Sequence, residues 1–232
     1  MTIGLSLVVF AYNEAENVPA VLGEVLAWLR RRGPDDELIF VDDGSTDGTR
    51  AAAETVLAGD RAARVVSHDR NRGIGAALKT GVRAASKPWV TFLPCDGQIP
   101  PGELDRLIAQ ADGGDVEVVL SVYRARDDGW HRKLLSGGVR TLILALHGVR
   151  LRSDGPYLFR RVLFDPEQLT PDTFFLNFEF PIRALRGKLR VATVEIECVP
   201  RRAGSSKSTG LRRIAGVARD LIGLRFRLWS GH

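Results

Sequence analysis

The chain has 232 residues and a hydrophobic content of 44%, which predicts a folded globular protein with one large domain, or one domain with an appendage. Its two cysteines and four histidines lack metal-ligand spacing, which argues against a zinc protein and favours a reducing, cytoplasmic setting. The net charge of +5 is unevenly spread, since residues 1–60 carry 11 acids against 4 Lys and Arg, whereas residues 201–232 carry 8 Lys and Arg against one acid. A basic segment favours nucleic acid, anionic lipid or a phosphorylated substrate as partner, and a solvated basic helix is the alternative.

Apolar runs and helical patterns alternate along the first 110 residues. The runs lack strict alternation of apolar and polar residues, as expected of parallel strands covered on both faces. They are LSLVVFAY (5–12), ELIFVDDG (37–44), ARVVSHD (63–69) and WVTFLPCD (89–96). Helices are predicted between them at 17–32, 47–59 and 73–86. This order predicts an α/β fold with an open, mostly parallel sheet, a type of sheet that binds ligands beyond the carboxyl ends of its strands.

The second half is predicted to add fewer strands and more helix. In chain order we expect a helix at 100–111, a strand at 116–126, a helix at 130–148 interrupted by its two adjacent glycines, a strand at 189–200 and a basic amphipathic helix at 208–229. The amino-terminal apolar run is expected to be the first strand rather than a signal peptide or membrane span, because polar residues follow within about ten positions.

Polar side chains gather in the loops that follow the first, second and fourth predicted strands. Since these loops converge at one edge of a parallel sheet, we expect Glu14, Asp42, Asp43 and Asp96 to approach one another. Carboxylates that share a crevice repel unless a cation or hydrogen-bond donors lie there, and a metal ion with the hydroxyls of a nucleotide would supply both. The alternative for the segment DDGSTDGT is capping of the following helix by its Ser and Thr residues.

A glycine-containing segment, DRNRGIGAALKTG (69–81), opens the third predicted helix. Its glycines indicate close approach of the backbone to a ligand, and tight packing without a ligand is the alternative. The segment is not a Walker motif, and no GxGxxG follows the first strand, which argues against a dinucleotide-binding Rossmann enzyme.

The motifs AYNEAENV, VDDGSTDGT, NRGIGAALKTGVRAA, CDGQIPP and RRAGSSK, in this order between residues 5 and 207, resemble those of inverting GT-A fold glycosyltransferases of family 2. The most similar group is the polyprenyl-phosphate (dolichol-phosphate mannosyltransferase-like) glycosyltransferases. The resemblance implies a Rossmann-like GT-A domain at 1–207, followed by a basic amphipathic helix at 208–232. The implied reaction transfers a hexose, with inversion, from a nucleotide diphosphate sugar of the GDP-mannose or UDP-glucose type to a polyprenyl or dolichyl monophosphate.

The resemblance also implies roles for individual residues. The implied donor-binding residues are Tyr12, Glu14, Asp42, Asp43, Asn71, Gly73, Gly75 and Ser206. The implied catalytic and acceptor-phosphate residues are Asp96, Arg124, Arg132, Ser136, Arg202 and Lys207. Mg²⁺ or Mn²⁺ is implied at Asp96 and Gln98. A phosphate monoester is already largely dianionic at neutral pH, so it needs cations to position it rather than a catalytic base. A solvated, flexible loop is the alternative for RRAGSSK.

Four positions depart from the family pattern. Pro94 replaces the first acid of Asp-x-Asp-x-Gln, so Asp96 is the one carboxylate of this motif. Mg²⁺ commonly binds through one or two carboxylates and takes its other oxygens from phosphates and water. We therefore expect a metal site that is weak without donor and that the donor diphosphate completes. Phe10 replaces a proline, Arg140 replaces an asparagine, and Asp154 does not align cleanly with the family's acid.

The expected partners follow from the resemblance and from the carboxyl-terminal helix. The helix is expected to lie on the cytoplasmic face of an anionic membrane, with packing onto the domain as the alternative. A peripheral protein is expected, with a membrane-protein partner or a homo-oligomer as options and without nucleic acid. Two other functions stay open: a family 2 enzyme with a non-lipid acceptor, and a non-catalytic nucleotide-sugar-binding protein that Pro94 has inactivated.

Overall fold

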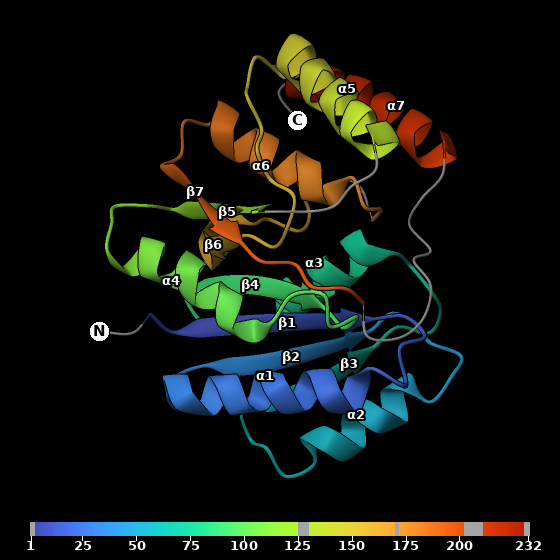
Figure 1. Cartoon of the computed structure of the whole chain (residues 1–232), viewed down its shortest axis with the longest axis vertical. Helices are drawn as coiled ribbons and strands as arrows, with labels where there is room; N and C mark the ends of the chain where they lie inside the picture. Colours follow the sequence, from blue (N-terminus) through green and yellow to red (C-terminus); the bar gives the residue numbers. More distant parts are fainter. Residues whose placement is uncertain (1–2, 125–129, 170–171, 202–210, 230–232) are drawn as a thin grey trace.

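The computed structural model describes residues 3–124, 130–169, 172–201 and 211–229, with the backbone alone at 130–136 and 211–215. Its described strands form one sheet in the order β3-β2-β1-β4-β6-β5-β7 (Figure 1). They are β1 (Leu5–Ala11), β2 (Glu37–Asp42), β3 (Ala63–Ser67), β4 (Trp89–Pro94), β5 (Val118–Tyr123), β6 (Leu158–Arg160) and β7 (Val191–Ile196). Strand β6 is antiparallel to β4 and β5, and the other pairs are parallel. The predicted mostly parallel sheet is therefore confirmed.

Helices cover both faces of the sheet. They are α1 (Val18–Arg32), α2 (Thr49–Leu57), α3 (Ile74–Ala84), α4 (Leu104–Asp112), α5 (Trp130–His147), α6 (Leu176–Arg186) and α7 (Leu211–Trp229), with short 3₁₀ turns η1 (Pro101–Glu103) and η2 (Arg161–Leu163). One buried cluster joins the sheet to α1, α2 and α4, and a second joins its other face to α3 and α6. Helices α5 and α7 lie side by side at the α6 end of the molecule (Figure 1).

The first strand shows why the central strands of this sheet have apolar residues at nearly every position. Leu5, Leu7 and Val9 enter the cluster with α1 and α4, whereas Val8 and Phe10 enter the cluster with α3. Successive side chains of a strand point to opposite faces, and here both faces are buried. The strands therefore end where polar residues begin, and this boundary sets the position of the loops at the carboxyl edge.

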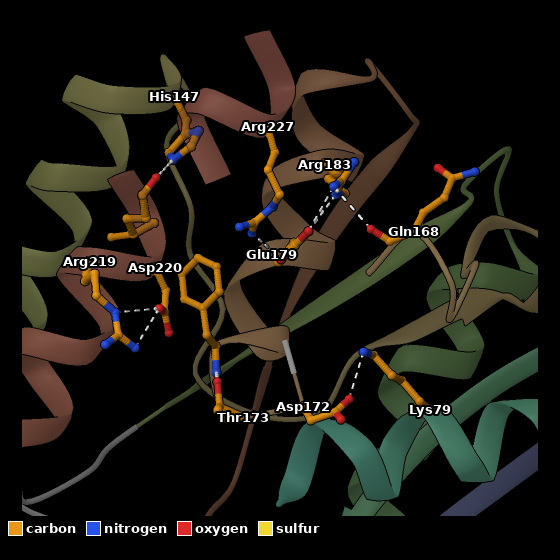
Figure 2. A network of polar contacts seen from close by, with 12 residues as sticks. Lys79, His147, Gln168, Asp172, Thr173, Glu179, Arg183, Arg219, Asp220 and Arg227 are labelled. Carbon is orange, nitrogen blue, oxygen red and sulfur yellow. Dashed lines mark hydrogen bonds and ion pairs between the residues drawn. The ribbon is translucent and has the colours of Figure 1, made fainter. Parts of the chain in front are cut away.

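Polar and apolar contacts attach helix α7 to the rest of the molecule. Leu221 and Leu224 are fully buried. Arg227 of α7 lies 3.2 Å from the carboxylate of Glu179 in α6, which is itself fully buried (Figure 2). The imidazole of His147 in α5 lies 3.1 Å from the carbonyl oxygen of Leu221 (Figure 2). One face of α7 thus packs on the domain, as the alternative in the sequence analysis held. The division at residue 207 stays a prediction.

One expectation for the second half is wrong, and one strand was not expected. The helix expected to break at Gly137 and Gly138 runs continuously as α5, because neither position requires a conformation outside the helical range. Strand β6 was not predicted, because three residues are too few to show a pattern. Among the described helices, none has the length and hydropathy needed to cross a membrane.

Candidate active site

The first loop (residues 12–17, after β1) and the second loop (43–48, after β2) are joined by hydrogen bonds. The Asn13 side-chain oxygen accepts a bond of 2.8 Å from the Thr46 amide, and the Asn13 amide donates to the Ser45 hydroxyl at 2.9 Å. The Glu14 amide donates to the Thr49 hydroxyl at 2.8 Å. Asn13 has a positive φ of 55°, which asparagine tolerates better than most residues. The Ser and Thr of DDGSTDGT therefore connect the two loops rather than cap α2.

Three further acidic and aromatic residues lie in or next to these two loops at the same edge. Asp42 is 3% exposed, and its carboxylate accepts a hydrogen bond from the Ser45 amide. Tyr12 is half-buried directly after β1. The start of α2 is organised by Asp47, whose carboxylate accepts the Thr49 amide at 2.9 Å. Asp42 thus orders the start of the second loop from within.

Asp43 is the anchor between the second loop and the segment that leads to α3. It is 4% exposed, and its carboxylate accepts hydrogen bonds from the amides of Arg72 and Gly73 at 2.9 and 2.8 Å. His68 lies 2.7 Å from the same carboxylate and 2.9 Å from the Thr80 hydroxyl. Because a carboxylate only accepts, the Nδ1 atom of the imidazole is the donor in the bond to Asp43. His68 is not among the site residues predicted from the sequence, although it directly follows strand β3.

The glycines that open α3 approach the protein's own backbone. A Cβ atom on Gly73 would lie 2.7 Å from the carbonyl oxygen of Asp172, and one on Gly75 would lie 2.6 Å from backbone atoms of Asp172 and Thr173. The Asp172 carbonyl accepts the Ala76 amide, and its carboxylate pairs with Lys79 of α3 at 2.9 Å (Figure 2). Tight packing, the alternative in the sequence analysis, therefore explains both glycines.

Asn71 lies exposed in the same segment, two residues before the start of the tightly packed glycine pair. It directly precedes Arg72, whose amide donates a hydrogen bond to Asp43. Its predicted role toward a donor stays a prediction.

The third loop (residues 95–100, after β4) presents Asp96. Its carboxylate accepts the Gln98 amide at 3.1 Å, across a turn in which Gly97 has a positive φ of 71°. The Gln98 carbonyl oxygen, expected to contact a metal ion, accepts a hydrogen bond of 2.9 Å from the Val199 amide, which occupies one of its two lone pairs. The pKa of the adjacent Cys95 thiol is raised, first by burial and then by the negative charges of Glu14 and Asp96.

Arg201 brings the first and third loops together. Its guanidinium contacts the Glu14 carboxylate and lies 3.6 Å from the Asp96 carboxylate. The residue predicted from the segment RRAGSSK is Arg202, whereas the described contact belongs to Arg201. Composition does not distinguish two adjacent arginines. Only position could have indicated Arg201, because it lies closer than Arg202 to the end of strand β7.

The predicted acceptor residues are only partly within the described residues. Arg124 directly follows β5, and its guanidinium lies 3.6 Å from Glu195 and 3.8 Å from Glu197 at the end of β7. The backbone of Arg132 and Ser136 lies in α5, but their side chains are outside the described part of the chain. Arg202, Ser206 and Lys207 lie wholly outside it.

Two positions that depart from the family pattern contact each other. Arg140 of α5 lies 2.7 Å from the carboxylate of Asp154. The Asp154 amide in turn donates to the Ser121 carbonyl of β5 at 2.9 Å. The arginine in place of asparagine therefore has a partner, and the pair connects α5 to the end of the sheet.

The acids at the carboxyl edge accommodate positive charge. Within the described residues, no three His, Cys, Asp or Glu side chains form a group that could hold a metal ion. The Glu14 and Asp96 carboxylates nevertheless share a cation, the Arg201 guanidinium. One carboxylate together with phosphate and water oxygens is a usual environment for Mg²⁺ and related ions, so Asp96 fits a divalent cation that a diphosphate accompanies.

A mostly parallel sheet with acidic loops at its carboxyl edge defines the molecule as an α/β protein, a class whose ligands commonly bind at that edge. The family model described as "Glycosyl transferase family 2" matches residues 6–181. The chain therefore belongs to glycosyl transferase family 2, and the recognition made from its motifs is confirmed.

Two relatives of this chain are undecaprenyl-phosphate sugar transferases. The chain is 31% identical over 223 residues to the undecaprenyl-phosphate 4-deoxy-4-formamido-L-arabinose transferase of Aeromonas hydrophila, an alignment that covers 94% of this chain and 66% of that protein. The identity to the corresponding transferase of Proteus mirabilis is 31% over 217 residues, with 90% and 64% covered. The chain thus spans slightly less than two thirds of the length of these relatives.

A solved structure confirms the GT-A fold. The glucosyl-3-phosphoglycerate synthase of Mycobacterium tuberculosis, in complex with Mn²⁺, uridine diphosphate and phosphoglyceric acid, superposes with a TM-score of 0.72 at 25% identity. The match covers 96% of this chain and 77% of that chain. A structural relative therefore holds a divalent cation together with a nucleoside diphosphate, as expected for this chain.

Proposed function

We propose that this chain transfers a sugar from a nucleoside diphosphate sugar to a polyprenyl monophosphate. The observation that carries the proposal is that the Glu14 and Asp96 carboxylates both lie against the Arg201 guanidinium, at the carboxyl edge of the sheet of a family 2 protein. The relatives named for undecaprenyl-phosphate transfer support the lipid acceptor, and they match over nearly the whole of this chain.

The donor side of the reaction uses the three loops. In the proposed complex the nucleoside lies against the first and second loops, while the diphosphate lies near Asp96. A divalent cation at Asp96 would neutralise negative charge on the leaving nucleoside diphosphate. Asp43 keeps the second loop and the start of α3 in place through its hydrogen bonds to the Arg72 and Gly73 amides. This pre-organisation lets the site bind the donor without first ordering its loops.

The acceptor side uses positive charge and no general base. A phosphate oxygen of the acceptor attacks the anomeric carbon of the sugar, and the bond from that carbon to the nucleoside diphosphate breaks with inversion. The acceptor dianion has no proton to lose, so cations that hold it in line supply the catalysis. Arg124 is the described cation on this side, and the predicted Arg132, Ser136, Arg202, Ser206 and Lys207 complete the proposed set.

A transfer assay tests this function. Radiolabelled GDP-mannose, UDP-glucose and a nucleotide-linked 4-deoxy-4-formamido-L-arabinose are each incubated with the protein, Mn²⁺ or Mg²⁺, and either a short polyprenyl phosphate or phosphoglyceric acid. Product that partitions into the organic phase supports the proposal, and transfer to phosphoglyceric acid alone would favour a non-lipid acceptor. Nucleotide binding without transfer from any donor would favour the non-catalytic alternative.

We propose further that α7 rests on an anionic membrane surface while it stays packed on the domain. Its outward stripe consists of Ile222, Phe226 and Trp229, which are 46%, 62% and 81% exposed. With about 3.6 residues per turn, the exposed Arg219 and Arg225 lie on either side of this stripe. Apolar side chains flanked by arginines suit a helix at the surface of an anionic bilayer.

Vesicle sedimentation tests this location. The protein is expected to sediment with phosphatidylglycerol-containing vesicles and to bind them less after Phe226→Ser combined with Trp229→Ser. Val162→Ser is the control, because Val162 is also exposed, at 82%, but lies in η2. Equal binding by both variants would contradict a role for the α7 stripe.

A further inference from the structure

Arg201 joins two acids that come from different strands. Glu14 follows β1, Asp96 follows β4, and Arg201 follows β7. The guanidinium contacts the Glu14 carboxylate and lies 3.6 Å from that of Asp96. The three side chains are 21%, 16% and 13% exposed, in the order Arg201, Glu14, Asp96, so the contact is largely shielded from water.

The position of Arg201 is set by the backbone that precedes it. The Val199 amide donates to the Gln98 carbonyl at 2.9 Å, which fixes the segment after β7 against the third loop. Pro200 then restricts the backbone between this hydrogen bond and Arg201. The contact with Asp96 is therefore built into the fold rather than made by a long side chain reaching across the surface.

This arrangement opposes a second cation at the same place. Without a positive charge, the carboxylates of Glu14 and Asp96 would repel each other. A divalent cation bonds a carboxylate oxygen at about 2.1 to 2.6 Å, depending on the ion. The guanidinium already faces the Asp96 carboxylate at 3.6 Å, so an added cation would meet a like charge in a weakly solvated site.

We propose that Arg201 competes with the divalent cation for Asp96, so that it balances the acids of the donor site until a metal-bound donor arrives. The inference deepens the proposed function, because it assumes that Asp96 is where the donor's cation binds. The donor diphosphate supplies the additional negative charge that lets the cation displace Arg201. Arg201 is a positioning residue in this account, since it acts through Asp96.

Mn²⁺ binding without donor tests the competition directly. Mn²⁺ is titrated into the full chain, and the free ion is followed by electron paramagnetic resonance. Arg201→Gln is expected to raise the Mn²⁺ affinity about tenfold, because it removes the competing charge. Arg190→Gln is the matched control, since Arg190 likewise contacts two acids, Asp115 and Glu117, but lies at the other end of β7.

Further variants separate the competition from a structural effect. Asp96→Asn combined with Arg201→Gln is expected to lose the gained affinity, and Arg201→Lys is expected to keep the wild-type affinity because it retains the charge. Thermal unfolding of each variant verifies that it is folded. If Arg201→Gln changes the Mn²⁺ affinity by less than twofold, or the gain survives loss of Asp96, the competition is wrong.

The result is independent of the transfer assay. Tighter Mn²⁺ binding by Arg201→Gln, in a protein that transfers no sugar, would support the competition and overturn the proposed catalysis. Transfer to polyprenyl phosphate with unchanged Mn²⁺ affinity in Arg201→Gln would do the reverse.

Discussion

The proposed donor half and the proposed acceptor half of the site are built differently. In the donor half the acids are buried and hydrogen-bonded, as for Asp43, which is 4% exposed and accepts from His68 and two backbone amides. In the acceptor half the charges lie near the surface, as for Arg124, whose side chain is 50% exposed and faces two acids that are each 59% exposed. This difference predicts that a substitution in the donor half lowers the stability of the fold as well as binding. A substitution in the acceptor half should lower binding alone.

In the donor half, the largest loss of stability is expected from removing the Asp43 carboxylate. Asp43→Ala is expected to lower the free energy of unfolding by about 3 kcal/mol, because two amides and one imidazole N–H lose their buried acceptor. Chemical denaturation measures this loss. Glu54→Gln is the control in the same half, since its pair with Arg50 is exposed and worth less than about 1 kcal/mol. Equal effects of the two variants would mean that the donor loops are not pre-organised by Asp43.

The acceptor half is expected to lose binding without losing stability. Arg124→Gln should raise the KM for polyprenyl phosphate about tenfold, because a charged hydrogen bond is worth about 1.5 to 3 kcal/mol. The free energy of unfolding should change little, since the pairs with Glu195 and Glu197 are exposed. Steady-state kinetics and denaturation of the same variant measure both quantities, with Arg190→Gln as control. A destabilised variant with unchanged KM would make Arg124 a structural residue.

The smallest expected effect concerns the junction of α5 and α7. Burial lowers the pKa of His147, and the neighbouring charges of Arg186 and Arg225 lower it further, against the opposing hydrogen bond to Leu221. The unfolded chain binds a proton near pH 6.5 and the folded chain binds it only at lower pH, so stability falls as pH falls below about 6.5. Denaturation of wild type and His147→Gln at pH 7.5 and 5.5 measures the difference. An unchanged pH dependence in the variant would show that His147 does not contribute to it.

Much of the fold could be predicted because its central strands, such as β1 and β2, are buried on both faces. The runs that form β1, β2 and β4 are recognisable from their apolar residues, and the positions of the three loops follow from where those runs end. The antiparallel β6 could not be predicted, since its three residues carry no periodicity. The continuity of α5 through Gly137 and Gly138 depends on backbone conformation, which composition does not determine.

The site was predictable in its acids and less so in its contacts. Glu14 and Asp96 were expected to meet at the carboxyl edge, and they share the Arg201 guanidinium. The choice of Arg202 over Arg201 rested on a motif whose two arginines are adjacent. Gly75 was interpreted as a place where a ligand approaches, but the neighbour is the backbone of Asp172, about 100 residues away in sequence. Long-range packing of this kind leaves no local signal.

The central claim is that Asp96 holds the donor's cation during transfer of a sugar to polyprenyl phosphate. The most direct measurement is the initial rate of formation of lipid-linked product by wild type and by Asp96→Asn, at saturating donor and Mn²⁺, with unfolding midpoints recorded for both. The account predicts a rate at least about 100-fold lower for Asp96→Asn with an unchanged unfolding midpoint. Product formed by Asp96→Asn at the wild-type rate would contradict it.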